Sequence, residues 1–150
     1  ITDGKKNVLP GNVKMTGDAR ALSKETNEKI ASKMLQIVEG ICNAHGVNGS
    51  VKYGTTCPVT FNSNNQAESA TKAAISLLGS EKCNGDIEPR LFSEDFSVMA
   101  SEKPGCFVLM GNGTSDQHSR PLHADDYDFN DELLVIGSSY WTELVEQQLK

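Results

Sequence analysis

The sequence predicts an α/β fold, in which helices pack against a β-sheet. Three patterns carry this prediction. Residues 12–21 alternate apolar or small side chains with polar ones, the stretch between Ser23 and Gly46 spaces its apolar side chains three or four positions apart, and residues 106–110 are continuously apolar. These patterns are typical of a strand with one solvated face, an amphipathic helix and a strand buried on both faces, respectively.

The first sixty residues predict a helix between two strands. The segment "NVKMTGDARA" (12–21) is predicted as a strand, and Ser23 then caps a helix that ends at Gly46, where a left-handed residue can stop it. The segment "GSVKYGTTCPVTF" (49–61) predicts another strand, interrupted by Pro58. The polar tract that follows marks a loop or a domain boundary. The helix carries its apolar side chains at Ile30, Met34, Ile37, Val38 and Ile41.

Two further helices are predicted in the middle of the chain. An alanine-rich helix is expected over about 66–78, ending at Gly79. Ser93 is expected to cap the next helix, with Glu94 and Asp95 in its first turn. Carboxylates are favourable there because the helix dipole is positive at its N-terminus. We therefore interpret this adjacent acidic pair as part of a helix start and not as a catalytic pair.

The last part of the chain predicts a buried strand and a terminal helix. The apolar run 106–110 ends abruptly at "GNG", residues 111–113. A helix is then expected over about 130–149, with one apolar face and with Asp128 or Asn130 as its cap.

The composition argues against two classes of partner. The 150 residues include 14 basic and 20 acidic side chains, giving a net charge of −6, and the lysines do not cluster. Nucleic acid is bound by a basic surface, so we expect no nucleic-acid partner. No apolar run approaches the roughly 18 residues of a membrane-spanning helix, so we expect no membrane partner either. A small molecule or another protein is the expected ligand.

The four cysteines are widely spaced and form no CxxC pair. This spacing indicates neither a structural zinc site nor a compact disulfide scaffold, and we interpret the residues as reduced thiols of a cytoplasmic protein. The chain begins at Ile1 without an initiator methionine, from which we expect that an N-terminal portion is missing. The cysteines are Cys42, Cys57, Cys83 and Cys106.

Four segments in a fixed order resemble one family. "NVLPGNVKMTGDAR", "SEDF", "PGCFVLMGNG" and "LHADDYDFNDELLVIGSSYW" look like consecutive signatures of the zinc-dependent amidohydrolase and exopeptidase family that includes hippurate hydrolase, aminoacylase and the plant auxin-conjugate hydrolases. The resemblance runs over nearly the whole chain and places it in the C-terminal part of such a protein. Two departures are Phe92, where relatives usually carry a small residue, and Ala124-Asp125, which replaces a common Asn-Pro.

The resemblance implies a two-domain organisation. Residues 1–60 look like the latter part of a ferredoxin-like α+β lid domain, which in the family also mediates dimerisation. Residues 61–150 look like the C-terminal part of the α/β catalytic domain of a di-metal exopeptidase. We therefore expect a homodimer formed through the lid domain.

The resemblance also implies the chemistry. In the family, two divalent metal ions bridged by a hydroxide attack an amide carbonyl while a glutamate transfers the proton. Zinc is expected, with manganese or nickel as alternatives. Most of the metal ligands and the glutamate come from motifs that would precede Ile1. We therefore expect no catalytic residue in this segment, and residues 1–150 alone to turn over nothing.

Three residues are candidates for the site. His123 matches the last metal-ligating histidine of the family, although residue type alone would favour an exposed loop histidine. Arg20 matches a lid arginine that grips the substrate carboxylate, which a guanidinium can do through two parallel hydrogen bonds. Asn7 matches a lid asparagine that contacts the substrate, but it is equally reasonable as a turn former. His45 and His118 are interpreted as ordinary surface histidines.

The predicted function of the full-length protein is hydrolysis of the amide bond of N-acyl amino acids, in the manner of hippurate hydrolysis. Two alternatives stay open. One is a dipeptidase or a deacylase of the same fold. The other is a non-catalytic dimerisation or interaction module, which would apply if the upstream metal-binding motifs were absent.

Overall fold

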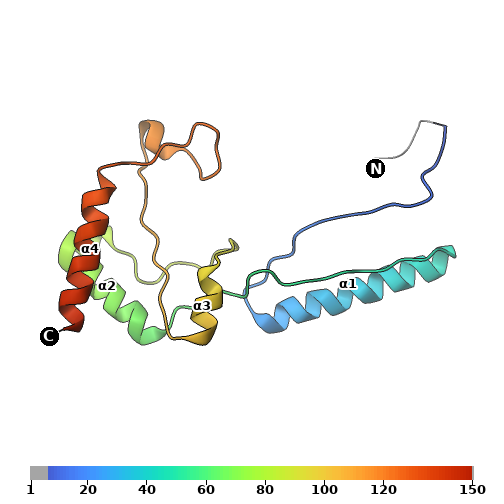
Figure 1. The fold of residues 1–150 in the computed structure, drawn as a ribbon, viewed down its shortest axis with the longest axis horizontal. Coiled ribbons are helices and arrows are strands. Elements are labelled where there is room, and N and C mark those ends of the chain that lie inside the picture. The colour runs from blue at the N-terminus through green and yellow to red at the C-terminus, as the bar shows by residue number, and fades with distance from the viewer. Residues whose placement is uncertain (1–6, 150) are drawn as a thin grey trace. The chain divides into compact units, whose positions relative to one another are not determined.

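The computed structural model describes residues 7–149, and the chain divides into two compact units between Gly54 and Thr55. The first unit contains α1 (Lys24–His45), and the second contains the remaining helical segments (Figure 1). These are α2 (Asn64–Leu78), the 3₁₀ helix η1 (Ser80–Lys82), α3 (Phe96–Glu102), the 3₁₀ helix η2 (Asp116–Ser119) and α4 (Leu133–Gln148). None of the helices within 7–149 is both long and apolar enough to cross a bilayer.

Helix α1 begins and ends at the residues that the sequence predicts. The Ser23 hydroxyl accepts a hydrogen bond from the Thr26 amide at 3.0 Å. At the other end Gly46 has a φ of 63°, and its amide donates to Asn43 O at 3.3 Å while the Val47 amide donates to Cys42 O at 3.0 Å. This pair of bonds is the Schellman arrangement, which satisfies carbonyl groups at the end of a helix. The predicted cap and the predicted left-handed stop are both confirmed.

The segment after Gly46 runs back along α1 within the first unit (Figure 1). The Tyr53 hydroxyl donates a hydrogen bond to the Asn27 side chain. Gly49 lies so close to the helix that a β-carbon there would collide with the Cys42 sulfur. The predicted apolar face of α1 is only partly covered by this segment, because α1 contains no buried residue and Ile37 and Ile41 are exposed.

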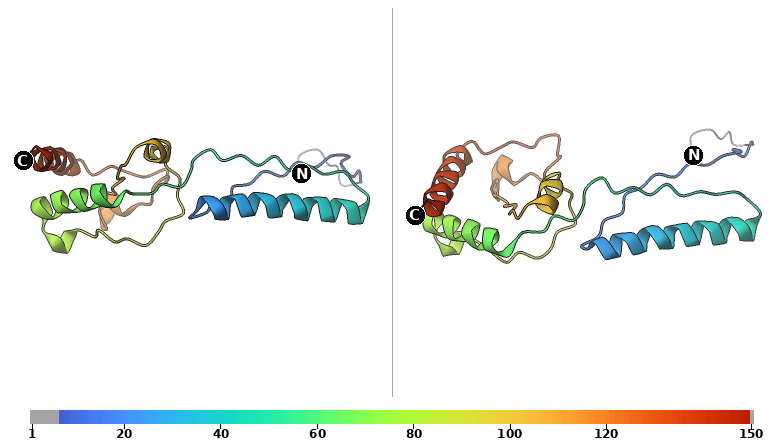
Figure 2. Two further views of the ribbon diagram at one scale, coloured as in Figure 1. Left: turned by 90° about the horizontal axis from the view of Figure 1, so that it is seen from below. Right: turned by 60° about the horizontal axis from the view of Figure 1, so that its bottom comes forward.

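The core of the second unit lies between α2 and α4, which pack side by side (Figures 1 and 2). Ala70 and Ala73 of α2 are buried, and so is Tyr140 of α4, whose hydroxyl donates to Ala70 O at 3.4 Å. The small alanine side chains let the large tyrosine ring approach the α2 backbone. Gly79, with a φ of 86°, ends α2 by donating its amide to Ile75 O at 2.9 Å, as predicted.

The apolar segment 105–110 is held against this unit by a side-chain amide. Asn62 donates to Phe107 O at 2.9 Å and accepts from the Phe107 amide at 2.8 Å. The neighbouring Ser63 amide donates to Gly105 O at 2.9 Å. The Phe107 ring lies against the Phe96 ring of α3, with centroids 5.6 Å apart. Asn62 therefore provides the pair of hydrogen bonds that a neighbouring strand would otherwise provide.

The predicted strands are wrong for the described structure. Residues 12–21, 49–61 and 106–110 lie outside the helices, but over 7–149 no β-strand forms, and the only β-type pairing there is an isolated bridge at Val8. The physical reason is that an extended segment becomes a strand only when another one lies alongside to complete the ladder of hydrogen bonds. The helical part of the α/β prediction is observed, and the lid domain over 1–60 stays a prediction.

Two predicted helix starts also differ from the structure. Helix α3 begins at Phe96, so Ser93 does not cap it, and the Ser97 hydroxyl instead donates to Glu94 O at 2.6 Å. Helix α4 begins at Leu133, about one turn later than predicted. Asn130 precedes α4, and its side-chain oxygen accepts a hydrogen bond from the Glu132 amide at 3.1 Å.

We expect opposite effects from two glycine-to-alanine substitutions at α1. Gly46→Ala puts a β-carbon on a left-handed residue, which should lower the free energy of unfolding by about 1–2 kcal/mol. Gly40→Ala lies inside the helix, where a β-carbon would meet nothing within 4 Å, and should raise it by about 0.5–1 kcal/mol. Denaturant unfolding of the full-length protein, followed by circular dichroism, measures both. Changes of the same sign would contradict the described end of α1.

Candidate functional site

His123 lies in a tight turn of the loop between η2 and α4. The Ala124 amide donates to Pro121 O at 3.1 Å, which closes a four-residue turn with His123 in its third position. His123 has a φ of 71°, a value that this position takes in a type II turn and that glycine or asparagine adopts most easily. The side chain is exposed. The turn thus presents the imidazole to solvent at some cost in backbone energy.

An ion pair and an asparagine close the loop around this turn. Arg120 and Asp126 stand on either side of His123 in the sequence, and Arg120 Nε lies 2.9 Å from an Asp126 carboxylate oxygen. Asn112 donates to His118 O at 3.2 Å and to Asp128 O at 2.8 Å, and it accepts from the Asn130 amide at 2.8 Å. The loop that carries His123 is therefore fastened at several levels.

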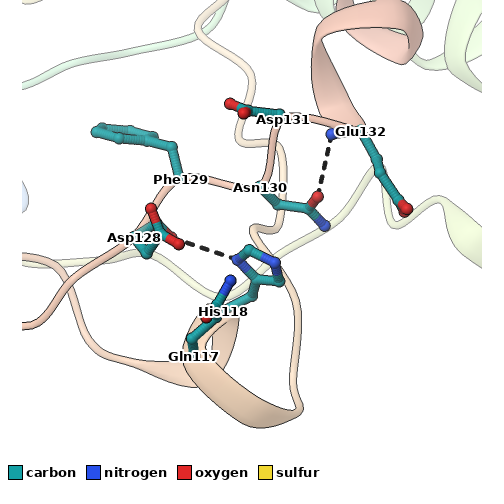
Figure 3. Close-up of a pocket in the computed structure, with 7 residues that line it drawn as sticks. All are labelled: Gln117, His118, Asp128, Phe129, Asn130, Asp131 and Glu132. Atoms are coloured by element: carbon teal, nitrogen blue, oxygen red, sulfur yellow. Dashed lines mark hydrogen bonds between the residues drawn. The ribbon is translucent and has the colours of Figure 1, made fainter.

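A pocket of about 330 Å³ opens beside this loop, lined by seven residues. Figure 3 shows the His118 ring directed toward Asp128 and Asn130, whereas the Phe129 ring points away from them. His118 Nδ1 lies 3.5 Å from Asp128 O, a long contact for a hydrogen bond. The lining residues are Gln117, His118, Asp128, Phe129, Asn130, Asp131 and Glu132.

Sequence reasoning missed the part that His118 and Asn112 play here. His118 was expected to be an ordinary surface histidine, but it is half-buried and its backbone is bound by Asn112. Asn112 was expected only to end a strand. Both roles depend on contacts across the loop, up to 18 positions apart, which no local spacing encodes. The one available signal was that "GNG" and "FND" each place an asparagine at the end of an apolar or aromatic run.

The described residues do not by themselves fit a metal site. Within residues 7–149, no group of three or more His, Cys, Asp or Glu side chains is placed to hold a metal ion. His123 can supply a neutral imidazole, but one imidazole does not close a coordination shell. A metal ion at His123 would need further ligands, so we derive no catalytic step through a metal from these residues.

Arg20 and Asn7 belong to the first unit, and His123 belongs to the second. Arg20 forms an ion pair with Asp18, with its Nη2 at 3.0 Å and its Nε at 3.2 Å from the same carboxylate oxygen. Its side chain is about half exposed, at 46%. Asn7 is exposed in a turn. Arg20 thus already pairs with a carboxylate, and two nitrogens of its guanidinium group approach the same Asp18 oxygen.

The second cavity, of about 310 Å³, lies against α2 and α4, and Cys106 is one of the residues that line it. Burial raises the pKa of Cys106 above its ordinary value of 9.0. Burial also raises the pKa of Tyr140, and the nearby Cys106 raises it further by charge repulsion. Both groups are therefore neutral near pH 7, and Cys106 is better described as a small apolar side chain than as a nucleophile.

The comparison with protein families gives one match. The model of peptidase family M20/M25/M40 matches residues 4–147. No solved structure shows a significant match to the chain.

Several curated proteins are similar over most of the chain. Hippurate hydrolase of Campylobacter jejuni is 28% identical over 144 residues, covering 96% of this chain and 37% of the relative. Thermostable carboxypeptidase 2 of Saccharolobus solfataricus is 26% identical over 136 residues, covering 89% of this chain and 34% of the relative. An IAA-amino acid hydrolase of Arabidopsis thaliana is 29% identical over 153 residues, covering 96% of this chain and 33% of the relative. The chain thus spans about one third of the length of these relatives.

We expect Cys106 to be alkylated more slowly at pH 8 than the other three cysteines. Its raised pKa leaves less thiolate, and the thiolate is the reactive form. As the pH rises through this raised pKa, the thiolate fraction grows and the difference should shrink. Pulsed iodoacetamide labelling of the native full-length protein, read by peptide mass spectrometry, measures the four rates. In urea all four should react alike, and a Cys106 that reacts first in the native protein would contradict the expectation.

Proposed function

Because the chain belongs to the peptidase family M20/M25/M40, we propose that the full-length protein is a metal-dependent hydrolase that cleaves the amide bond of N-acyl amino acids. The similarity to a hippurate hydrolase and to an IAA-amino acid hydrolase supports this substrate class. The structural observation that carries the proposal is the exposed His123 held with a φ of 71° in a fastened loop. A strained residue that the surroundings hold in place is a mark of a functional position.

The proposed cofactor is a pair of divalent metal ions, with zinc first and manganese or nickel as alternatives. We assign one ligand to this chain, the His123 imidazole, in keeping with the family resemblance of "LHADDYDFND". The other ligands and the general base would come from elsewhere in the full-length protein. Residues 1–150 alone are therefore expected to hydrolyse no hippurate-like substrate.

Arg20 is the proposed contact for the free carboxylate of the substrate, and Asn7, at the other end of the same sequence motif, is proposed as a second substrate contact. The ion pair with Asp18 supports this assignment, because it shows the guanidinium fork binding a carboxylate from its own chain. In the proposed complex the substrate carboxylate would take the place of Asp18. The Asp18 side chain is 78% exposed, so water can hydrate its carboxylate after displacement, and an exposed ion pair of this kind contributes little free energy.

Residues 1–60 are proposed to be the latter part of a lid domain that forms a homodimer. The apolar side chains exposed along α1 support a partner surface in this unit. A cytoplasmic location is proposed from the four cysteines, all of which are free thiols.

A second candidate function is the hydrolysis of a peptide bond. The similarity to a thermostable carboxypeptidase favours it, since that relative is similar over 89% of this chain. Both candidates require a substrate with a free carboxylate next to an amide. Comparing N-acyl amino acids with dipeptides as substrates of the full-length protein separates the two.

We expect His123→Gly to lower metal content and hydrolysis together in the full-length protein. Glycine is the informative replacement because it adopts a φ of 71° freely, so the variant removes the imidazole without adding strain. Loss of a direct ligand should weaken metal binding by more than the roughly 10- to 100-fold seen when a ligand's outer partner is removed. Metal analysis after dialysis and hydrolysis of hippurate-like substrates measure the effect.

Asp116→Gly is the matched control for this experiment. Asp116 is the other non-glycine residue with positive φ in the described chain, at 52°, and it is the first residue of η2, just before the loop that carries His123. Replacing it relieves similar strain without removing an imidazole. Full activity in both variants would overturn the role of His123.

We expect Arg20→Ala to reduce kcat/KM for carboxylate-bearing substrates by roughly 10- to 150-fold, the range for hydrogen bonds to a charged group. Substrates whose carboxylate is converted to an amide should be hydrolysed at an unchanged rate. Arg20→Lys should recover only part of the loss, because lysine lacks the bidentate fork. Arg90→Ala, at another exposed arginine, is the control. Equal losses on both kinds of substrate would contradict carboxylate binding by Arg20.

A further inference from the structure

Asn112 joins three backbone positions that are distant in the sequence. Its side-chain nitrogen donates to His118 O at 3.2 Å and to Asp128 O at 2.8 Å, and its side-chain oxygen accepts from the Asn130 amide at 2.8 Å. An asparagine amide has two donors and two acceptor lone pairs. Asn112 therefore uses both donors and one acceptor site on a single loop.

The orientation of this amide follows from its partners. A backbone carbonyl can only accept a hydrogen bond and a backbone amide can only donate one, so exchanging the nitrogen and oxygen of Asn112 would break all three contacts. Asn130 adds a reciprocal bond, because its side-chain nitrogen donates to Asn112 O at 3.3 Å. The end of the apolar segment is thus tied to the residues that precede α4.

His123 lies midway in the sequence between the two carbonyl groups that Asn112 binds. Inside that span the Arg120 and Asp126 side chains pair at 2.9 Å, and inside that pair the turn from Pro121 to Ala124 is closed at 3.1 Å. Asn112 and His118 are the half-buried residues of a stretch that is otherwise exposed from 111 to 120. Of the two bonds that set the span of the His123 loop, the one to His118 O is partly buried and the one to Asp128 O is exposed. The bond from the Asn130 amide is also partly buried, and hydrogen bonds shielded from water are stronger.

We propose that Asn112 is a positioning residue for His123: its amide sets the span from His118 to Asp128 and so fixes where the turn presents the imidazole. The inference rests on the metal-binding role proposed for His123. Asn112 acts on the backbone at both ends of the span and takes no part in the chemistry itself. The backbone groups that it binds belong to residues that line the described pocket, His118, Asp128 and Asn130 (Figure 3).

Asn62 shows what a merely structural asparagine would do. It also bridges two segments through both ends of its amide, at 2.9 and 2.8 Å from Phe107, but it lies outside the His123 loop. If Asn112 were only structural, replacing either Asn112 or Asn62 would lower the stability of the protein and leave its metal affinity unchanged. If Asn112 positions His123, only its own replacement changes metal affinity.

The test uses Asn112→Ala, Asn112→Asp and Asn62→Ala in the full-length protein. Asn112→Asp has the same shape, but it turns a carboxylate oxygen toward two carbonyl oxygens and should be at least as damaging as alanine. Zinc affinity of the metal-free protein is measured by competition with a chromophoric chelator, and backbone hydrogen exchange is followed over 113–129. Both Asn112 variants should bind zinc roughly 10- to 100-fold more weakly and exchange faster in this loop. Asn62→Ala should lower Tm with unchanged zinc affinity.

The outcomes separate this inference from the proposed function. A wild-type protein that binds no zinc, manganese or nickel would overturn the proposed function and the role of Asn112 with it. A wild-type protein that binds metal, with unchanged affinity and loop exchange in Asn112→Ala, would overturn only the role of Asn112. So would an equal loss of affinity in Asn62→Ala. If Asn112→Ala does not fold, Asn112→Ser, which keeps an acceptor for the Asn130 amide, serves in its place with the same two readouts.

Discussion

Backbone groups in long extended segments must find hydrogen-bond partners, and in the second unit asparagine side chains supply them. The segment from Gly105 to Asn112, which contains the apolar run 106–110, has no neighbouring strand among the described residues. Asn62 binds both backbone groups of Phe107 near its start, and Asn112 binds the Asn130 amide at its end. Partly buried amide and carbonyl groups are costly without partners, so Asn62 holds the segment near its start and Asn112 holds its end.

This constraint connects the packed helices to the loop that carries His123. Tyr140 packs on α2, and the Cys106 side chain lines the cavity that Tyr140 also lines. The same segment then ends at Asn112, which sets the span of the loop. One extended segment thus joins the packed helices to this loop, and Asn112, at the end next to the loop, is the residue that sets the loop's span. Two alanines, a tyrosine and a serine are the buried residues of the described chain, so this packing is thin and the hydrogen bonds count for more than usual.

Local chemistry explains which elements the sequence could predict. The cap at Ser23 and the stops at Gly46 and Gly79 depend on residues within one turn, so the pattern alone places them. Strands could not be placed in the same way, because alternation shows that a segment can pair but not that a partner lies alongside. Ser93 failed as a cap because a serine before two acids is compatible with a loop as well as with a helix start, and α3 begins only at Phe96.

The same distinction between local patterns and distant contacts applies to the candidate site. His123 could be singled out from its motif, since "LHADDYDFND" is a local pattern. The fastening by Asn112 could not, because it joins residues 6, 16 and 18 positions apart. Arg20 could be matched to a carboxylate-binding role, but its ion pair with Asp18 is a matter of side-chain conformation and needed the structure.

The departure at Ala124-Asp125 is explained by the turns around His123. Ala124 closes the first turn with its amide and accepts the Tyr127 amide at 3.2 Å, which closes a second turn. Asp125 is the second residue of that turn, where proline is favoured because its fixed φ suits the position. The common Asn-Pro of the family would thus fit the same path, and aspartate keeps the path while giving up proline's rigidity. The change makes the loop more flexible but keeps its backbone path, so His123 stays in the third position of its turn. A loop less stiffened by its own sequence depends more on the ties that close it, which are the Arg120–Asp126 pair and Asn112.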